Sequence, residues 1–253
     1  MAKIVSFSNQ KGGVGKTTSC VNISAQIANK GKKVLMIDMD PQGNATSGLG
    51  ISKSKAKKTI YDVIIGRCSI EEAIIKTKFK NLSVVPANID LAGAELELYD
   101  MDEDKNFTKL ALDSIKDQFD YIFIDCPPSL GMLTVKALSS SDGVVIPMQC
   151  EFYSLEGMSQ LFNTVKKIRQ IYNPELQIVG ILLTMYNARL TLTNQVVAEL
   201  KKYYAEKLFK VPISRTVRLA AAPSYGEPIC YYDPYGKGSL EYAAVAKELM
   251  LRI

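Results

Sequence analysis

The chain has 253 residues, of which 47% are hydrophobic; this is enough for one substantial core, so a single domain over residues 1–253 is expected. It contains no histidine, which excludes imidazole as a general base or metal ligand, and its five cysteines include no C-x-x-C pair that would indicate a zinc site. The net charge of +5 permits an anionic partner without requiring one.

No basic leader followed by an apolar stretch precedes the first predicted strand, and no apolar run is long enough to cross a bilayer. An odd number of cysteines does not suggest a disulfide framework. We therefore expect a soluble, cytoplasmic protein with reduced, mostly buried thiols.

A glycine-rich stretch, NQKGGVGKTT at residues 9–18, lies between a predicted strand at 4–7 and a predicted helix at 19–28. In that context the backbone N–H groups and the helix dipole form a cradle for a polyphosphate. Lys16 would reach the β- and γ-phosphates, and the Thr17 hydroxyl would sit on the accompanying magnesium. The residues expected to contact the nucleotide are Lys11, Gly12, Gly13, Val14, Gly15, Lys16, Thr17 and Thr18.

The second predicted strand, residues 33–38, is a continuous apolar run that ends in an acid, which is typical of a strand buried on both faces of a parallel sheet. Asp38 and Asp40 would lie at its carboxyl tip, where open α/β sheets bind ligands. Two carboxylates there can orient magnesium and an attacking water. The alternative is an Asp-Pro turn with helix-capping acids.

The middle of the chain is interpreted as scaffold. Residues 53–58 carry a basic run, for which a solvated surface segment is favoured over a nucleic-acid contact. Periodicity predicts a strand at 82–86 and short helices at 59–65, 70–76, 91–98 and 107–116, with an acidic turn at 100–104.

Another apolar strand, residues 121–125, ends in Asp125 and is followed by two prolines that predict a sharp exit. This is the Walker B pattern, in which the acid holds magnesium through water because magnesium keeps several waters and prefers oxygen ligands. A strand-terminal acid that only caps the next helix is the alternative.

Alternation continues with strands at 143–147 and 178–184 and helices at 154–172, 193–207 and 239–253. The whole pattern predicts an α/β, P-loop NTPase-like fold: a mostly parallel twisted sheet with helices on both faces.

The glycine-rich loop departs from the ordinary Walker A motif, because Gln10 stands where that motif has glycine and Lys11 adds a second lysine. It resembles the deviant Walker A, Lys-Gly-Gly-x-Gly-Lys-Thr, of the family that includes the partition ATPases ParA/Soj, the septum-site ATPase MinD and the nitrogenase iron protein. The string Asp-Pro-Gln-Gly-Asn at 40–44 resembles the switch region of ParA/Soj in particular, and the likeness extends over essentially the whole chain.

This resemblance implies ATP and Mg²⁺ as ligands, with Lys11, Lys16 and Asp40 as catalytic residues and Thr17, Asp40 and Asp125 at the metal. It implies that Lys11 acts across a two-fold dimer interface. Asn187 would read the adenine, or else be a plain turn-forming asparagine. Ser214 and Thr216 replace the proline and asparagine usual beside the base. Candidate DNA-binding residues are Arg189 and Arg218, which match DNA-binding positions of Soj-type proteins, and Arg215, inferred from its neighbourhood, with the nucleotide pocket as its alternative location.

The function that the resemblance implies is ATP-dependent partition of a chromosome or plasmid. An ATP-bound homodimer would bind double-stranded DNA without sequence preference, associate with the nucleoid, and be released by hydrolysis stimulated by a ParB/Spo0J-like partner. A MinD-like membrane ATPase is the alternative; the tail at 239–253 has no basic excess for an anionic bilayer. A metabolic P-loop synthetase is a third reading. An iron–sulfur protein of this family would need a cysteine near the exit of the Walker B strand, and residues 129–132 contain none.

Overall fold

The computed structural model describes residues 1–99, 107–151 and 154–253. Within these ranges seven strands form one sheet in the order β3-β4-β2-β5-β1-β6-β7. Every neighbouring pair is parallel except β3 and β4, which are antiparallel. The strands are β1 (Lys3–Phe7), β2 (Val34–Asp38), β3 (Ile75–Lys76), β4 (Leu82–Val85), β5 (Tyr121–Asp125), β6 (Gly143–Gln149) and β7 (Gln177–Thr184).

Each helix predicted from the sequence is present, although one is cut short at the sheet edge. The helix expected over 70–76 stops at Ala73, and the next residues pair with β4 as the short strand β3. The acidic turn predicted at 100–104 lies outside the described residues. The α-helices are α1 (Lys16–Asn29), α2 (Asn44–Gly48), α3 (Ile60–Ile64), α4 (Ile70–Ala73), α5 (Leu91–Tyr99), α6 (Phe107–Ile115), α7 (Met132–Ser139), α8 (Ser154–Ile171), α9 (Thr191–Tyr204), α10 (Val217–Ala221), α11 (Ile229–Tyr232) and α12 (Lys237–Arg252), and the short 3-10 helices are η1 (Lys53–Lys55), η2 (Ala205–Lys207) and η3 (Ala222–Tyr225).

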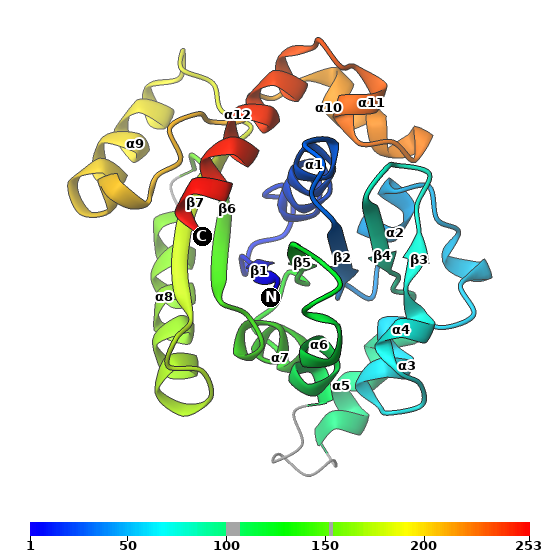
Figure 1. Cartoon of the computed structure of the whole chain (residues 1–253). Coiled ribbons are helices and arrows are strands. Elements are labelled where there is room, and N and C mark those ends of the chain that lie inside the picture. The colour runs from blue at the N-terminus through cyan, green and yellow to red at the C-terminus, as the bar shows by residue number, and fades with distance from the viewer. Residues whose placement is uncertain (100–106, 152–153) are drawn as a thin grey trace.

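Helices cover both faces of the sheet (Figure 1), because successive side chains of a strand point to opposite faces. Val34 and Met36 of β2 pack with α1 and the C-terminal helices, whereas Leu35 and Ile37 pack with α3 to α7. β6 and β7 contribute to a third cluster with α8 and α9. The arrangement confirms the predicted α/β fold with helices on both faces.

The two helices at opposite ends of the chain, α1 and α12, lie against each other (Figure 1). Ser19 of α1 and Tyr242 of α12 form a hydrogen bond of 3.1 Å between their hydroxyls, and Gln26 donates to the Ser239 carbonyl at 2.9 Å. Val245 and Leu249 of α12 are fully buried in the same core. α12 is therefore a packing helix, as its balanced charge predicted. Among the described residues, no helix is both apolar enough and long enough to span a membrane.

The sheet order places the predicted site elements side by side. β5 lies between β1 and β2, with Phe7 and Asp38 both in register with Asp125. Because all three strands are parallel, their carboxyl ends share one edge of the sheet. The glycine-rich loop after β1 and the acids that end β2 and β5 therefore meet at that edge.

Candidate functional site

The glycine-rich loop ends in the first turn of α1, which begins at Lys16, three residues before the predicted start. Gly13 and Gly15 have φ of 71° and 82°, a left-handed backbone that side chains with a Cβ rarely adopt. The helix N-terminus therefore opens directly into the loop, where its unpaired N–H groups favour an anion.

Three side-chain hydrogen bonds join this loop to the ends of two neighbouring strands. Asn9 donates to the Pro147 carbonyl, Gln149 donates to the Gly13 carbonyl, and Thr184 donates to the Val14 carbonyl, each at 2.7 Å. The ends of β6 and β7 thus fix the loop from one side. Gln149 and Thr184 were not predicted as site residues, because a partner more than 100 positions away leaves no local pattern in the sequence.

Lys16 is buried, with 6% of its surface exposed, and its ammonium donates to the Lys11 carbonyl at 2.9 Å. Burial lowers the pKa of this lysine, while the nearby Asp125, Cys126 and Asp40 oppose the shift. The ammonium is therefore held inside the loop and beside the acids at the sheet edge.

Asp125 is fully buried, and neither of its carboxylate oxygens has a hydrogen-bond partner among the described residues. Burial and then the neighbouring Asp38 carboxylate raise its pKa well above the usual range, against the effects of Thr17 and Lys16. A buried carboxylate without a partner is costly unless it meets a cation. Its position beside Thr17 fits a magnesium ion, which needs few protein ligands because it retains water. The described residues contain no cluster of three or more acids, histidines or cysteines able to hold a metal alone.

The two acids after β2 differ in their environment. The Asp38 carboxylate accepts hydrogen bonds from the Thr46 hydroxyl at 2.7 Å, the Thr46 N–H at 2.8 Å and the Asp40 N–H at 3.2 Å. Burial raises the pKa of Asp38 to about 6, and these hydrogen bonds oppose the shift. Asp38 thus holds the loop after β2 in place, which is the role expected from the alternative interpretation of this segment as an Asp-Pro turn. Within the described residues, the Asp40 carboxylate accepts one hydrogen bond, from the Gln42 N–H at 2.9 Å.

Thr46→Val is expected to destabilise the protein by about 2–3 kcal/mol, because a buried acid and the Ala87 N–H both lose the hydroxyl as a partner. For a chain of this size the melting temperature should fall by about 5–10 °C. Thermal unfolding without nucleotide measures the change. Thr46→Ser keeps the hydroxyl and is the control, with a loss of about 1 kcal/mol for the deleted methyl. A valine variant as stable as the serine variant would contradict this role.

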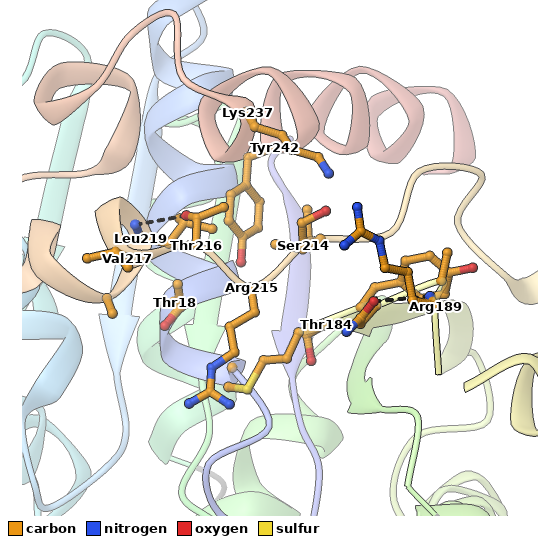
Figure 2. A pocket seen from close by; sticks show the side chains of 17 residues that line it. Thr18, Thr184, Arg189, Ser214, Arg215, Thr216, Val217, Leu219, Lys237 and Tyr242 are labelled. Carbon is orange, nitrogen blue, oxygen red and sulfur yellow. Dashed lines mark hydrogen bonds between the residues drawn. The ribbon is translucent and has the colours of Figure 1, made fainter. Parts of the chain in front are cut away.

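A cavity of about 930 Å³ adjoins the loop (Figure 2). Thr18 of α1, Tyr242 of α12 and Thr184 of β7 line it, together with the segments 185–189 and 213–217. Its volume is that of a small-molecule site. Asn187, Ser214, Thr216, Arg189 and Arg215, which were assigned to base or DNA, are brought together here.

Three polar residues of the cavity have hydrogen-bond partners within the chain. Asn187 accepts a hydrogen bond from the Arg189 N–H at 3.1 Å, so it does form the turn that was its alternative role. The Ser214 hydroxyl donates to Glu241 at 2.7 Å. Thr216 caps α10 by accepting from the Leu219 N–H at 3.1 Å. Contacts of these three residues with a base stay predictions.

The three candidate DNA-binding arginines are divided between two places. Arg189 and Arg215 line the cavity, with guanidinium groups that point in opposite directions in Figure 2. Arg218 lies outside the cavity lining, and its guanidinium lies 5.9 Å from the centre of the Tyr232 ring. All three side chains are exposed, as contacts with DNA phosphates require.

Two further lysines contact the site. Lys11 forms an ion pair with Glu151, in which both side chains remain partly exposed to solvent. Lys53, the first residue of the basic run, donates to the Gln42 carbonyl at 2.7 Å, so that end of the run rests on the loop after Asp40. The exposed Lys55 and Lys57 agree with a solvated segment.

Comparison with known proteins gives consistent relatives over nearly the whole chain. A family model described as an AAA domain matches residues 2–178. The sporulation initiation inhibitor protein Soj of Bacillus subtilis is 51% identical, over 98% of each chain. The chromosome partitioning protein ParA of Myxococcus xanthus is 46% identical, over all of this chain and 89% of the relative. The structure of cobyrinic acid a,c-diamide synthase from Mycobacterium smegmatis with an ATP analogue and magnesium superposes with a TM-score of 0.87, at 34% identity, over 99% of this chain and 95% of that one. With this sequence identity, sheet order and loop, the chain belongs to the ParA/Soj family of chromosome-partitioning ATPases.

Proposed function

We propose that this chain is an ATP-driven DNA-partition switch. ATP with magnesium joins two subunits, the resulting dimer binds DNA without sequence preference, and hydrolysis, stimulated by a ParB/Spo0J-like partner, returns it to free subunits. The observation that carries the proposal is the sheet edge, where a buried lysine in a glycine-rich loop lies beside a buried carboxylate that accepts no hydrogen bond from the described residues.

The residues at this edge have separable tasks. Lys16 and the loop N–H groups would hold the phosphates, and the cavity lined by Thr18 and Asn187 would take the nucleoside. A magnesium ion held by Thr17 and Asp125 would neutralise charge on the phosphates. Asp40, whose carboxylate accepts a hydrogen bond from the Gln42 N–H alone among the described residues, would orient the attacking water.

Lys11 would not be needed in its own subunit, because Lys16 already supplies a buried positive charge. We assign it to the phosphates of the second subunit, where it would supply charge only when two ATP-loaded subunits face each other. In the single chain it pairs instead with Glu151. Exchange of Glu151 for the phosphates of the second subunit would couple nucleotide binding to dimer assembly.

The contacts of α12 favour DNA over a membrane surface as the partner. A membrane-binding helix needs an apolar face and a basic excess available to lipid. Here Tyr242, Val245 and Leu249 are buried against the core, and Glu248 and Arg252 pair with each other. The synthase alternative is less supported than partition, because identity is 34% with the synthase and 51% with Soj.

The proposal is tested by retention on random DNA with and without ATP. Arg189→Glu or Arg218→Glu should abolish ATP-dependent retention and leave dimerisation intact, because an acid repels the phosphates that an arginine would contact. With about four phosphate contacts per dimer, wild-type affinity should fall about a hundredfold between about 50 and about 200 mM salt.

Arg169→Glu on α8 is the matched control. It reverses one exposed charge near the end of a helix that runs back toward the amino ends of the strands, away from the nucleotide edge. It should retain DNA like the wild type. Salt-insensitive binding to one defined sequence, or equal losses in all three variants, would contradict the proposal.

A further inference from the structure

The segment between η2 and α10 forms one wall of the cavity and runs beside β7. Phe209 donates from its N–H to the Ile181 carbonyl at 3.0 Å, and Ile213 donates to the Leu183 carbonyl at 2.8 Å. Tyr186 in turn donates to the Ile213 carbonyl at 2.9 Å. The wall is therefore an irregular extension of the sheet edge, and its outer side needs another element to hold it.

α12 supplies that support through three charged side chains. Arg252 donates to the carbonyls of Lys207, at 3.1 Å, and Leu208, at 2.6 Å. Glu248 accepts from the Lys210 N–H at 3.0 Å. Glu241 accepts from Ser214, both from its N–H at 2.8 Å and from its hydroxyl at 2.7 Å.

Glu241 differs from the other two because its partner is part of the cavity wall. Ser214 lines the cavity, whereas Lys207, Leu208 and Lys210 do not. The Glu241 side chain is only 12% exposed, and its second neighbour, the Lys237 ammonium at 3.8 Å, also lines the cavity. Hydrogen bonds to a carboxylate with little access to water are strong and directional.

We propose that Glu241 is a positioning residue for the nucleotide: by holding Ser214 at two points, it sets the wall of the cavity that faces the base. The inference rests on the proposed ATP-binding function. Arg215 and Thr216 follow directly in the chain, and Thr216 begins α10 through its cap. A Ser214 that has lost its anchor would therefore shift the whole 214–216 wall and the start of α10.

The test compares ATP affinity, turnover and melting temperature in matched variants. Glu241→Ala removes both acceptors and should raise the Kd for MgATP about tenfold, with kcat changed less than about twofold, because the phosphate-contacting groups are unaltered. Glu241→Gln keeps one acceptor oxygen and should raise the Kd about threefold. Ser214→Ala removes only the hydroxyl and should also raise it about threefold. The Ser214→Ala, Glu241→Ala double variant should match Glu241→Ala, because the two single changes remove a shared contact.

Glu248→Ala is the control, because Glu248 occupies the same helix and supports the same segment outside the cavity. It should lower the melting temperature and leave the Kd for MgATP within about twofold. Should Glu241→Ala not fold, Glu241→Gln and Ser214→Ala give the decision. Wild-type affinity in the Glu241 and Ser214 variants, or an equal loss in Glu248→Ala, would overturn the positioning role. A wild-type chain that does not bind MgATP would overturn the proposed function instead.

Discussion

Lys11→Ala is expected to bind ATP about as tightly as the wild type, to remain monomeric or dimerise only weakly, and to lose turnover by about a thousandfold or more. The reason is geometric. Lys16 is buried among the loop carbonyls and acids, so the phosphates of the same subunit already have their cation. Lys11 instead has a partly exposed side chain that pairs with Glu151, and alanine would keep the residue 11 carbonyl that accepts from Lys16.

Gly12→Val separates assembly from binding in the same loop. Among the described residues, a Cβ at this position would come within 4 Å of the Pro128 Cβ alone, at 3.8 Å, which is an ordinary contact within one subunit. Valine should therefore fold and bind ATP. It should fail to dimerise, because the proposed dimer would bring two such loops close together across a two-fold axis.

Size-exclusion chromatography with ATP and a phosphate-release assay measure both variants. Lys55→Ala, which removes an exposed lysine of the basic run, is the control and should behave as the wild type. A Lys11→Ala protein that dimerises, hydrolyses ATP and retains DNA normally would exclude action across the interface.

Asp40→Ala is expected to trap the ATP-bound dimer on DNA, with phosphate release reduced by about a hundredfold to ten-thousandfold. Asp40 is nearly buried at the sheet edge and would orient water, while Lys16 and the loop hold the nucleotide without it. The neighbouring Asp38 keeps its three hydrogen bonds, because the donor at residue 40 is the backbone N–H, which alanine also has. The loop should therefore retain its shape.

The expected signature is DNA binding that persists after free ATP is removed. Filter retention measures this binding, and phosphate release is measured in parallel. Asp90→Ala, which changes an exposed acid, should cycle like the wild type. Lys16→Ala is the contrasting variant, because it should lose ATP binding. If Asp40→Ala loses ATP affinity as completely as Lys16→Ala, Asp40 holds the nucleotide and does not act on water.

The strand pattern and its acids were predictable because they depend on local sequence. Apolar runs that end in Asp38 and Asp125 predict parallel strands, and such strands place their final residues on one edge. β3 was missed because two residues are too short to show a period, and its pairing with β4 depends on tertiary contacts. α1 begins earlier than predicted because the glycine-rich loop already leads into its first turn.

The polar contacts within the site could not be predicted in the same way. Glu241 holds Ser214 from 27 residues away, and Glu151 pairs with Lys11 over 140 residues. Neither acid belongs to a motif, and only the folded chain brings each to its partner. Thr46 carries a weak signal, since it follows the acids closely, yet its hydroxyl could equally have pointed to solvent.

The packing of α1 against α12 makes the order of synthesis matter. Ile23 and Ile27 of α1 belong to the same buried cluster as Tyr242 and Leu249 of α12. About 200 residues separate the two helices, so a growing chain would carry the unfinished apolar face for about 10–40 s at typical translation rates. The phosphate loop and α1 are therefore synthesised early, whereas α12, which packs against α1, is synthesised last. Nucleotide binding should consequently begin only when α12 has emerged, and the nascent chain needs protection from aggregation until then.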